Sequence, residues 1–236
     1  EVIKMSNSNL VSYTQLSPNH SGPRTQKISR FTPHCFVGQV SVERGCKSFE
    51  DPKRNASCNY LLGTDGRTAL GVPEGYRSWC TSSAYNDQRA ITVECASDAT
   101  APYAFNNKVW EALIALAVDC CKRNGKDKFI YIPDKTQALA YKPKDNEMLM
   151  TFHRWYAKKS CPGDWFVSNA HKFAEAVQER LTGYVEVPIY VKPNPGEGLR
   201  AIARRCGITF EEIKKLNPWC KAPMYIVPMR KDVRIK

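Results

Sequence analysis

The chain of 236 residues lacks long apolar runs, and no segment reaches the roughly 18 apolar residues that indicate a membrane-spanning helix. Its opening segment, EVIKMSNSNL, has neither a basic region nor an apolar core, so it does not look like a secretory signal peptide, although a leader further upstream is left open. RNP sequences and two-Cys two-His fingers are missing too. We therefore expect no membrane span and no nucleic-acid partner.

The sequence also lacks paired CxxC motifs. Its ten cysteines are spread over the chain, and several lie in apolar stretches where a cysteine acts as a small hydrophobic residue. This distribution favours mostly reduced thiols in a protein made in a cytoplasm, and sequence alone cannot assign a disulfide. Positive charge is abundant, at a net +12, and favours a polyanionic partner such as nucleic acid, an anionic membrane or an anionic cell wall.

The distribution of apolar residues predicts an α/β protein. Residues 1–27 are polar and are expected to form an extended N-terminal arm or an irregular lead-in. Residues 28–183 contain short strands and two amphipathic helices, and the domain boundary is expected near residue 184. The expected elements are strands at 27–37, 90–95 and 129–132, a hairpin at 58–72, helices at 109–121 and 166–181, and loops at 73–89 and 133–147.

Residues 184–236 differ from the rest of the chain in composition and in the spacing of their apolar residues. A proline-rich link leads to a strand near Tyr190, two short helices at 199–206 and 210–216, and apolar pairs at 225–235 that fit a final strand. Strand, helix, helix and strand in so few residues predict a small, compact βααβ module.

Only four histidines are available as metal ligands. His20 lies in the polar arm and His171 lies beside Lys172, so the better candidates are His34, at the end of a strand, and His153. The segment TFHRWYAKKSCPG places His153 eight residues before Cys161, with Lys159 between them. Two histidines and a cysteine are a ligand set that catalytic zinc accepts, with a fourth position left for water.

Four motifs follow one another along the chain: Thr-Pro-His34-Cys, the Asp-Gly hairpin at 57–66, Asn-Asp followed by an alternating strand ending in Glu94, and His-x7-Cys-Pro-Gly with a lysine two residues before the cysteine. In this order they resemble the motifs of the zinc amidases in the peptidoglycan recognition protein and phage lysozyme-amidase family. The resemblance implies a central mixed β-sheet flanked by helices. It also implies hydrolysis of the amide between N-acetylmuramic acid and the L-alanine of the peptidoglycan stem peptide.

The same resemblance implies the roles of individual residues. His34, His153 and Cys161 would hold one Zn²⁺, Lys159 would stabilise the oxyanion, and Glu94 would act as general base or hydrogen-bond partner. The alternative for Lys159 is that it is a solvated surface residue without a catalytic role. The alternative for Glu94 is that it only forms an ion pair with a basic neighbour. Some relatives carry a tyrosine just before the hairpin strand, where this chain has Cys58. Relatives also often carry a histidine near the position of Trp79, where this chain has Cys80.

The C-terminal module resembles a LysM domain, through Tyr-Val-Lys-Pro at 190–193, Gly-Glu-Gly-Leu at 196–199 and Leu-Asn-Pro at 216–218. That resemblance implies binding of N-acetylglucosamine-containing glycans, and the residues it points to are Gly196, Glu197, Gly198, Leu199, Asn217 and Pro218. The leading hypothesis is thus a peptidoglycan amidase targeted to the cell wall, either a phage endolysin released through a holin or a bacterial autolysin. The alternative is a peptidoglycan-binding protein without activity; binders of this family commonly lose the cysteine ligand, which is present here.

Overall fold

The computed structural model describes residues 7–183, 190–218, 220 and 232–234. They belong to two compact units, Glu1–Gly183 and Tyr184–Lys236. The first unit is built on a seven-stranded sheet in which β4 and β5 are antiparallel and the other neighbouring strands are parallel. Across the sheet the strands are β1 (Val11–Thr14), β5 (Thr68–Leu70), β4 (Tyr60–Leu62), β7 (Ala90–Cys95), β3 (Arg30–Cys35), β9 (Glu147–Met150) and β8 (Lys128–Ile130).

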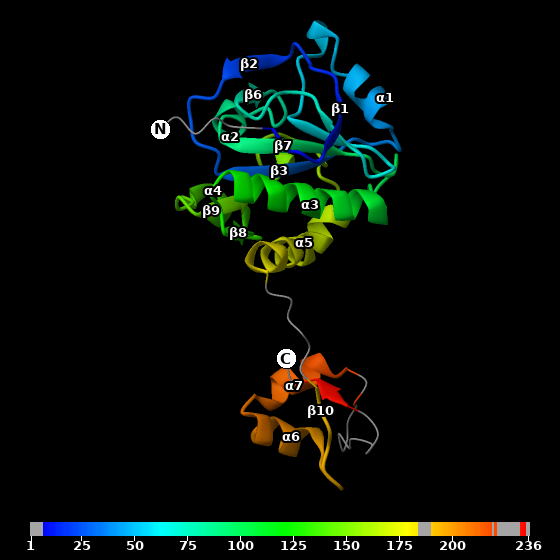
Figure 1. The fold of residues 1–236 in the computed structure, drawn as a ribbon, viewed down its shortest axis with the longest axis vertical. Helices are drawn as coiled ribbons and strands as arrows, with labels where there is room; N and C mark the ends of the chain where they lie inside the picture. Colours follow the sequence, from blue (N-terminus) through cyan, green and yellow to red (C-terminus); the bar gives the residue numbers. More distant parts are fainter. Residues whose placement is uncertain (1–6, 184–189, 219, 221–231, 235–236) are drawn as a thin grey trace. The chain divides into compact units, whose positions relative to one another are not determined.

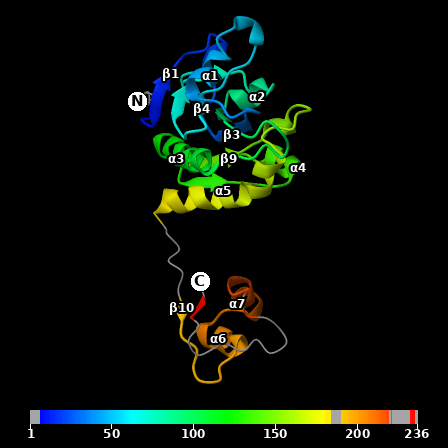
Figure 2. The ribbon, with the colours of Figure 1, turned by 90° about the vertical axis from the view of Figure 1, so that its right-hand side faces the viewer.

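Helices cover both faces of this sheet. The two long helices, α3 (Asn107–Arg123) and α5 (Asp164–Thr182), pack side by side on one face, as Figures 1 and 2 show. The short helix α1 (Val42–Lys47) packs on the other face against β4 and β5. Side chains alternate along a strand, so Tyr60 and Leu62 join the core under the long helices while Leu61, between them, joins the smaller core under α1. The fold is therefore a mixed sheet flanked by helices, as predicted.

Local signals explain the long helices. The Asn106 side chain accepts a hydrogen bond from the backbone N–H of Val109, which caps the start of α3. Helix α3 ends before Asn124 and Gly125, and α5 ends at Gly183, which adopts the left-handed conformation (φ 67°). The predicted hairpin and the strand that carries Glu94 are also present, as β4–β5 and β7.

The structure corrects three expectations for irregular segments. The expected arm contains β1, an edge strand of the main sheet, and β2 (His20–Pro23), which pairs with β6 (Tyr76–Ser78). The loops expected at 73–89 and 133–147 also contain structure, because Ser83 caps α2 (Ala84–Asp87) and Asp134 caps α4 (Lys135–Ala140). Short 3₁₀ turns complete the unit at η1 (Pro52–Arg54) and η2 (His153–Trp155).

The second unit has the expected order of elements. Its parts are β10 (Tyr190–Val191), α6 (Leu199–Cys206), α7 (Phe210–Leu216) and β11 (Val233–Arg234), and β10 pairs antiparallel with β11. Thr209 and Glu212 form a reciprocal capping box at the start of α7. The second unit has a hydrophobic core of its own, which contains the buried residues Leu199, Ile202, Ala203, Ile213, Cys220 and Val233. Most of the strand predicted at 225–235 lies outside the described residues.

No helix in the described part of the chain combines the length and the apolar character needed to cross a membrane.

Candidate metal centre and cleft

His34 and Glu94 occupy opposing positions on neighbouring parallel strands. They are register partners in β3 and β7, near the carboxyl ends of both strands. Phe31 and Cys35 of β3 belong to the core beneath α3 and α5, so alternation directs His34 to the opposite face of the sheet. The Nδ1 atom of His34 lies 3.8 Å from Oε1 of Glu94. The carboxyl ends of parallel strands are where α/β sheets usually present functional groups.

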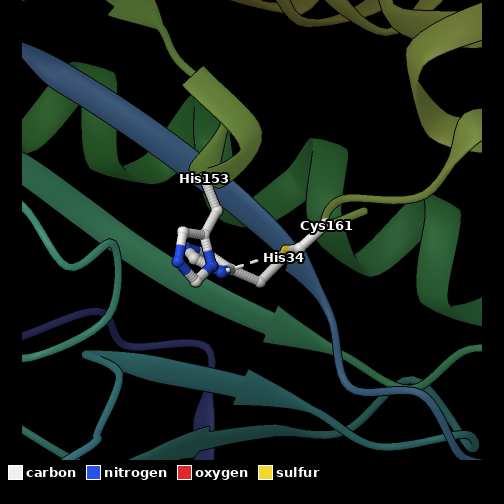
Figure 3. Close-up of side chains that lie close together, drawn as sticks. All are labelled: His34, His153 and Cys161. Atoms are coloured by element: carbon white, nitrogen blue, oxygen red, sulfur yellow. Dashed lines mark hydrogen bonds between the residues drawn. The ribbon is translucent and has the colours of Figure 1, made fainter. Parts of the chain in front are cut away.

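His153 and Cys161 converge on His34 from the segment that follows β9. Strand β9 lies next to β3 and leads into η2, which begins at His153, while Cys161 lies in the loop just before α5. Figure 3 shows the three side chains pointing toward one another. The Sγ atom of Cys161 lies 3.2 Å from Nδ1 of His34, the two imidazole rings are 5.0 Å apart, and one donor atom from each residue lies within 4.8 Å of the others.

Each of the two histidines has a buried nitrogen atom without a hydrogen-bond partner. These atoms are Nε2 of His34 and Nε2 of His153. Burial lowers the pKa of His34 well below its usual value, and the charge of His153 acts in the same direction. Burial, together with nearby Lys159, lowers the pKa of His153 to about 4. Both imidazoles are therefore neutral at pH 7, which is the form that binds metals.

Glu94 is the acidic group nearest to these ligands. Its Oε2 atom is buried and has no hydrogen-bond partner. Burial raises the pKa of Glu94 to about 8, and the thiol of Cys35 acts in the same direction. A carboxyl group whose pKa lies near neutrality can both accept and donate a proton at physiological pH.

A cleft of about 530 Å³ opens beside this cluster. Its lining residues come from the segment after η1, from the β6–α2 region and from the metal-ligand segment: Asn55, Ala56, Arg77, Trp79, Cys80, Ser82, Ser83, Ala84, Asp87, His153 and Lys159. His153 thus connects the candidate metal centre to the cleft. Lys159 is exposed and lines the same cleft.

Cys80 is a site residue that the sequence reasoning did not assign. Its thiol lies within 4.8 Å of donor atoms of both His34 and Glu94, so these three residues form a second group with metal-binding chemistry. The sequence did contain one signal for Cys80: it occupies a position where relatives often have a histidine. Cys58, the other departure, is fully buried, and burial and Glu94 together raise its pKa well above its usual value.

The residues predicted to bind glycan in the second unit have different environments. Gly196 is exposed with a positive φ of 74°, and Pro218 is exposed as well. Glu197 forms an ion pair with Arg205 at 2.8 Å. Leu199 is completely buried in the module's core, and the buried side chain of Asn217 donates a hydrogen bond to the carbonyl of Ile213.

This fold and site define a mixed α/β protein with a cluster of two histidines and one cysteine at the carboxyl ends of its parallel strands. Comparison with known families then identifies the chain. Residues 24–164 match the family model described as N-acetylmuramoyl-L-alanine amidase, and the chain belongs to this family. No curated protein matches it.

Several solved structures are similar to the chain. The hydrolase AmiA of Staphylococcus aureus, solved with its ligand, matches with 14% identity and a TM-score of 0.49, covering 73% of this chain and 85% of that one. A mutant endolysin from Bacillus subtilis matches with 14% identity and a TM-score of 0.45, covering 70% and 97%. The Ph2119 endolysin from a Thermus scotoductus bacteriophage matches with 15% identity and a TM-score of 0.43, covering 69% and 99%.

Proposed function

We propose that the protein is a zinc-dependent N-acetylmuramoyl-L-alanine amidase that hydrolyses the bond between N-acetylmuramic acid and the L-alanine of the peptidoglycan stem peptide. The observation that carries the proposal is the convergence of His34, His153 and Cys161 at one edge of the cleft, in a chain of this family. Bacterial peptidoglycan is accordingly the proposed substrate and partner.

The three residues fit one zinc ion. Donor atoms of a tetrahedral zinc site lie about 3.3–3.8 Å apart, because zinc–ligand bonds are about 2.0–2.3 Å long. The distance of 3.2 Å from Nδ1 of His34 to Sγ of Cys161 nearly meets this spacing. The Nε2 atoms of both histidines are buried without a hydrogen-bond partner, which supports the proposal that these imidazoles are available to a metal ion. When bound, zinc supplies a Lewis acid that lowers the pKa of water and polarises a carbonyl group.

The remaining residues have roles that follow from their charge and position. Glu94, whose Oε1 atom lies 3.8 Å from Nδ1 of His34, would take a proton from the attacking water and pass it to the leaving amine. Lys159 brings a positive charge to the side of the cleft that contains His153 and would stabilise negative charge developing on the amide oxygen. The walls of the cleft, including Trp79, would hold the stem peptide and exclude water.

The second candidate function is binding of peptidoglycan without hydrolysis. A pure binder needs the cleft but has no need of a thiol beside two imidazoles. Cys161 is present, and its sulfur lies in contact with His34, which favours catalysis.

We further propose that the second unit is a LysM module that binds cell-wall glycan. The proposed surface consists of the loop at 196–198, where Gly196 is exposed, and the turn at Pro218. Leu199 and Asn217 would contribute by holding these loops from inside the core, since both side chains are buried. Residues 184–236 hold eleven Lys and Arg against five Asp and Glu, a surplus that suits an anionic wall. Such a protein would be made in a bacterial cytoplasm and would act at the cell wall after phage-mediated release or export.

Metal analysis combined with wall digestion tests the proposal. The purified protein should contain about one zinc per chain and release stem peptides with new N-terminal alanine from cell walls. Cys161→Ala should lose the release, while Cys206→Ala, a cysteine of the other unit, should keep both the zinc and the release. Release of reducing sugar ends instead of N-terminal alanine, or full activity in Cys161→Ala, would overturn the mechanism.

A further inference from the structure

We infer that His34, Cys80 and Glu94 form a second, alternative position for the metal ion, which shares His34 with the proposed catalytic position and takes Glu94 out of use. The inference rests on the proposed metal centre, and goes beyond it by assigning Cys80 and an inactive state of the same site.

The donor atoms of this second group are close enough to bind one cation. All three lie within 4.8 Å of one another, and Nδ1 of His34 is 3.8 Å from Oε1 of Glu94. That spacing matches the roughly 3.3–3.8 Å expected between ligands of a tetrahedral zinc ion. The His34 side chain is 1% exposed, and its Nε2 atom has no hydrogen-bond partner. Oε2 of Glu94 is likewise buried and unpartnered.

Cys80 is held in this position by its backbone. The N–H of Cys80 donates a hydrogen bond to Oδ2 of Asp87 at 3.1 Å, and the N–H of Trp79 donates to Oγ of Ser57 at 3.0 Å. Asp87 also accepts from the backbone and hydroxyl of Thr81, so the loop after β6 is tied down on both sides of the thiol. A thiol fixed in this way approaches a metal ion with little loss of conformational freedom.

The two positions compete for the same nitrogen atom. Nδ1 of His34 faces Sγ of Cys161 at 3.2 Å and Oε1 of Glu94 at 3.8 Å, so one ion can use it from either side but two ions cannot. The second position combines one thiolate with one carboxylate, whose two negative charges balance a divalent cation, whereas the first has a single thiolate. Binding there releases two protons to solvent at neutral pH, one from the Cys80 thiol and one from the Glu94 carboxyl group, whose pKa of about 8 leaves it largely protonated. It also occupies the carboxylate proposed as general base, so the protein would be inactive in that state.

Cobalt binding distinguishes the two positions without any measurement of activity. Thiolate ligands give Co²⁺ an intense near-ultraviolet charge-transfer absorption. Titration of the metal-free Cys161→Ala protein with Co²⁺ should retain this absorption to within about twofold of wild type, because Cys80 supplies the thiolate. Cys161→Ala/Cys80→Ala should lose the absorption. Cys161→Ala/Cys35→Ala, which removes a different thiol that interacts with Cys161, should keep it.

The outcomes separate this inference from the proposed function. If wild type binds Co²⁺ through a thiolate but Cys161→Ala does not, the alternative position is wrong and the catalytic centre stands. Retention of the absorption in the double variant that lacks Cys80, or its loss in the one that lacks Cys35, also overturns the inference. If wild type itself shows no thiolate absorption, the proposed metal centre fails. Circular dichroism of each variant confirms that the fold is intact.

Discussion

Two adjacent lysines near the candidate centre differ in what they face. Lys158 and Lys159 are both exposed, but Lys159 lines the cleft and its charge lowers the pKa of His153. Lys158 is not among the residues that line this cleft. The pair therefore offers a matched comparison of a cation inside the proposed active site with one outside it.

Replacing Lys159 with methionine should lower the rate of amide hydrolysis by about 10²–10³-fold, because a cation that stabilises the developing oxyanion is lost. The zinc content should stay at about one per chain, since no ligand is removed. Rates on soluble muropeptide, with metal analysis, measure both. Lys158→Met is the control and should change the rate less than about twofold. Equal effects of the two substitutions would show that Lys159 acts only through surface charge.

At the residue scale, the cluster of His34, His153 and Cys161 was predicted from the resemblance of their sequence motifs to those of the zinc amidases. The three residues are far apart in the sequence, and nothing else in it indicated that they would be in contact. Cys80 could not be predicted to approach Glu94, because its position depends on how the loop after β6 is anchored by Asp87. Long-range placement of a loop by a buried carboxylate leaves no local periodicity in the sequence.

At the scale of elements, the loop from η2 to α5 determines where Cys161 lies. Gly163 precedes the first residue of α5 and has a φ of 90°, which L-residues rarely adopt. A Cβ atom at Gly163 would lie 2.8 Å from the carbonyl oxygen of Pro102 and 2.9 Å from Cβ of Tyr103. Two requirements, a positive φ and close approach of backbone, therefore favour glycine here.

The substitution Gly163→Ala should reduce the free energy of unfolding by about 3 kcal/mol or more, since it adds a backbone clash to an unfavourable φ. Gly125→Ala is the matched control: Gly125 also has a positive φ, of 65°, but nothing lies within 4 Å of an added Cβ. It should cost only about 1–2 kcal/mol. Denaturant unfolding of both variants measures the difference. Similar losses at the two positions would mean that the contact with Pro102 relaxes without cost.

Prediction of elements succeeded where apolar periodicity was long and failed where it was short. Helices α3 and α5 contain several turns of amphipathic pattern with clear end signals, and both were predicted. Strand β1 has four residues, of which only alternate ones are partly buried, so its pairing with β5 is not visible locally. Helix α4 buries a single residue, Ala138, and its clearest signal was the cap at Asp134.

At the scale of the whole molecule, each unit has its own hydrophobic core. The larger core lies between the sheet and α3 and α5, while the second unit encloses Leu199, Ile202 and Ile213 among its own helices and strands. All the candidate metal ligands belong to the first unit. Catalysis and wall binding are therefore expected to be separable.

Deletion of residues 184–236 should leave hydrolysis of soluble muropeptide within about twofold of the full-length rate, because the cleft and the metal ligands stay intact. Binding to intact cell walls should weaken by about 10²-fold or more, since a second attachment point is lost. Co-sedimentation with purified walls measures binding, and the same assay in high salt reports how much of it is electrostatic, because salt screens exposed charges.

A truncated protein that sediments with walls as well as the full-length chain would place wall binding in the first unit. Loss of muropeptide hydrolysis in a truncated protein that remains folded would show instead that the second unit contributes to the active site.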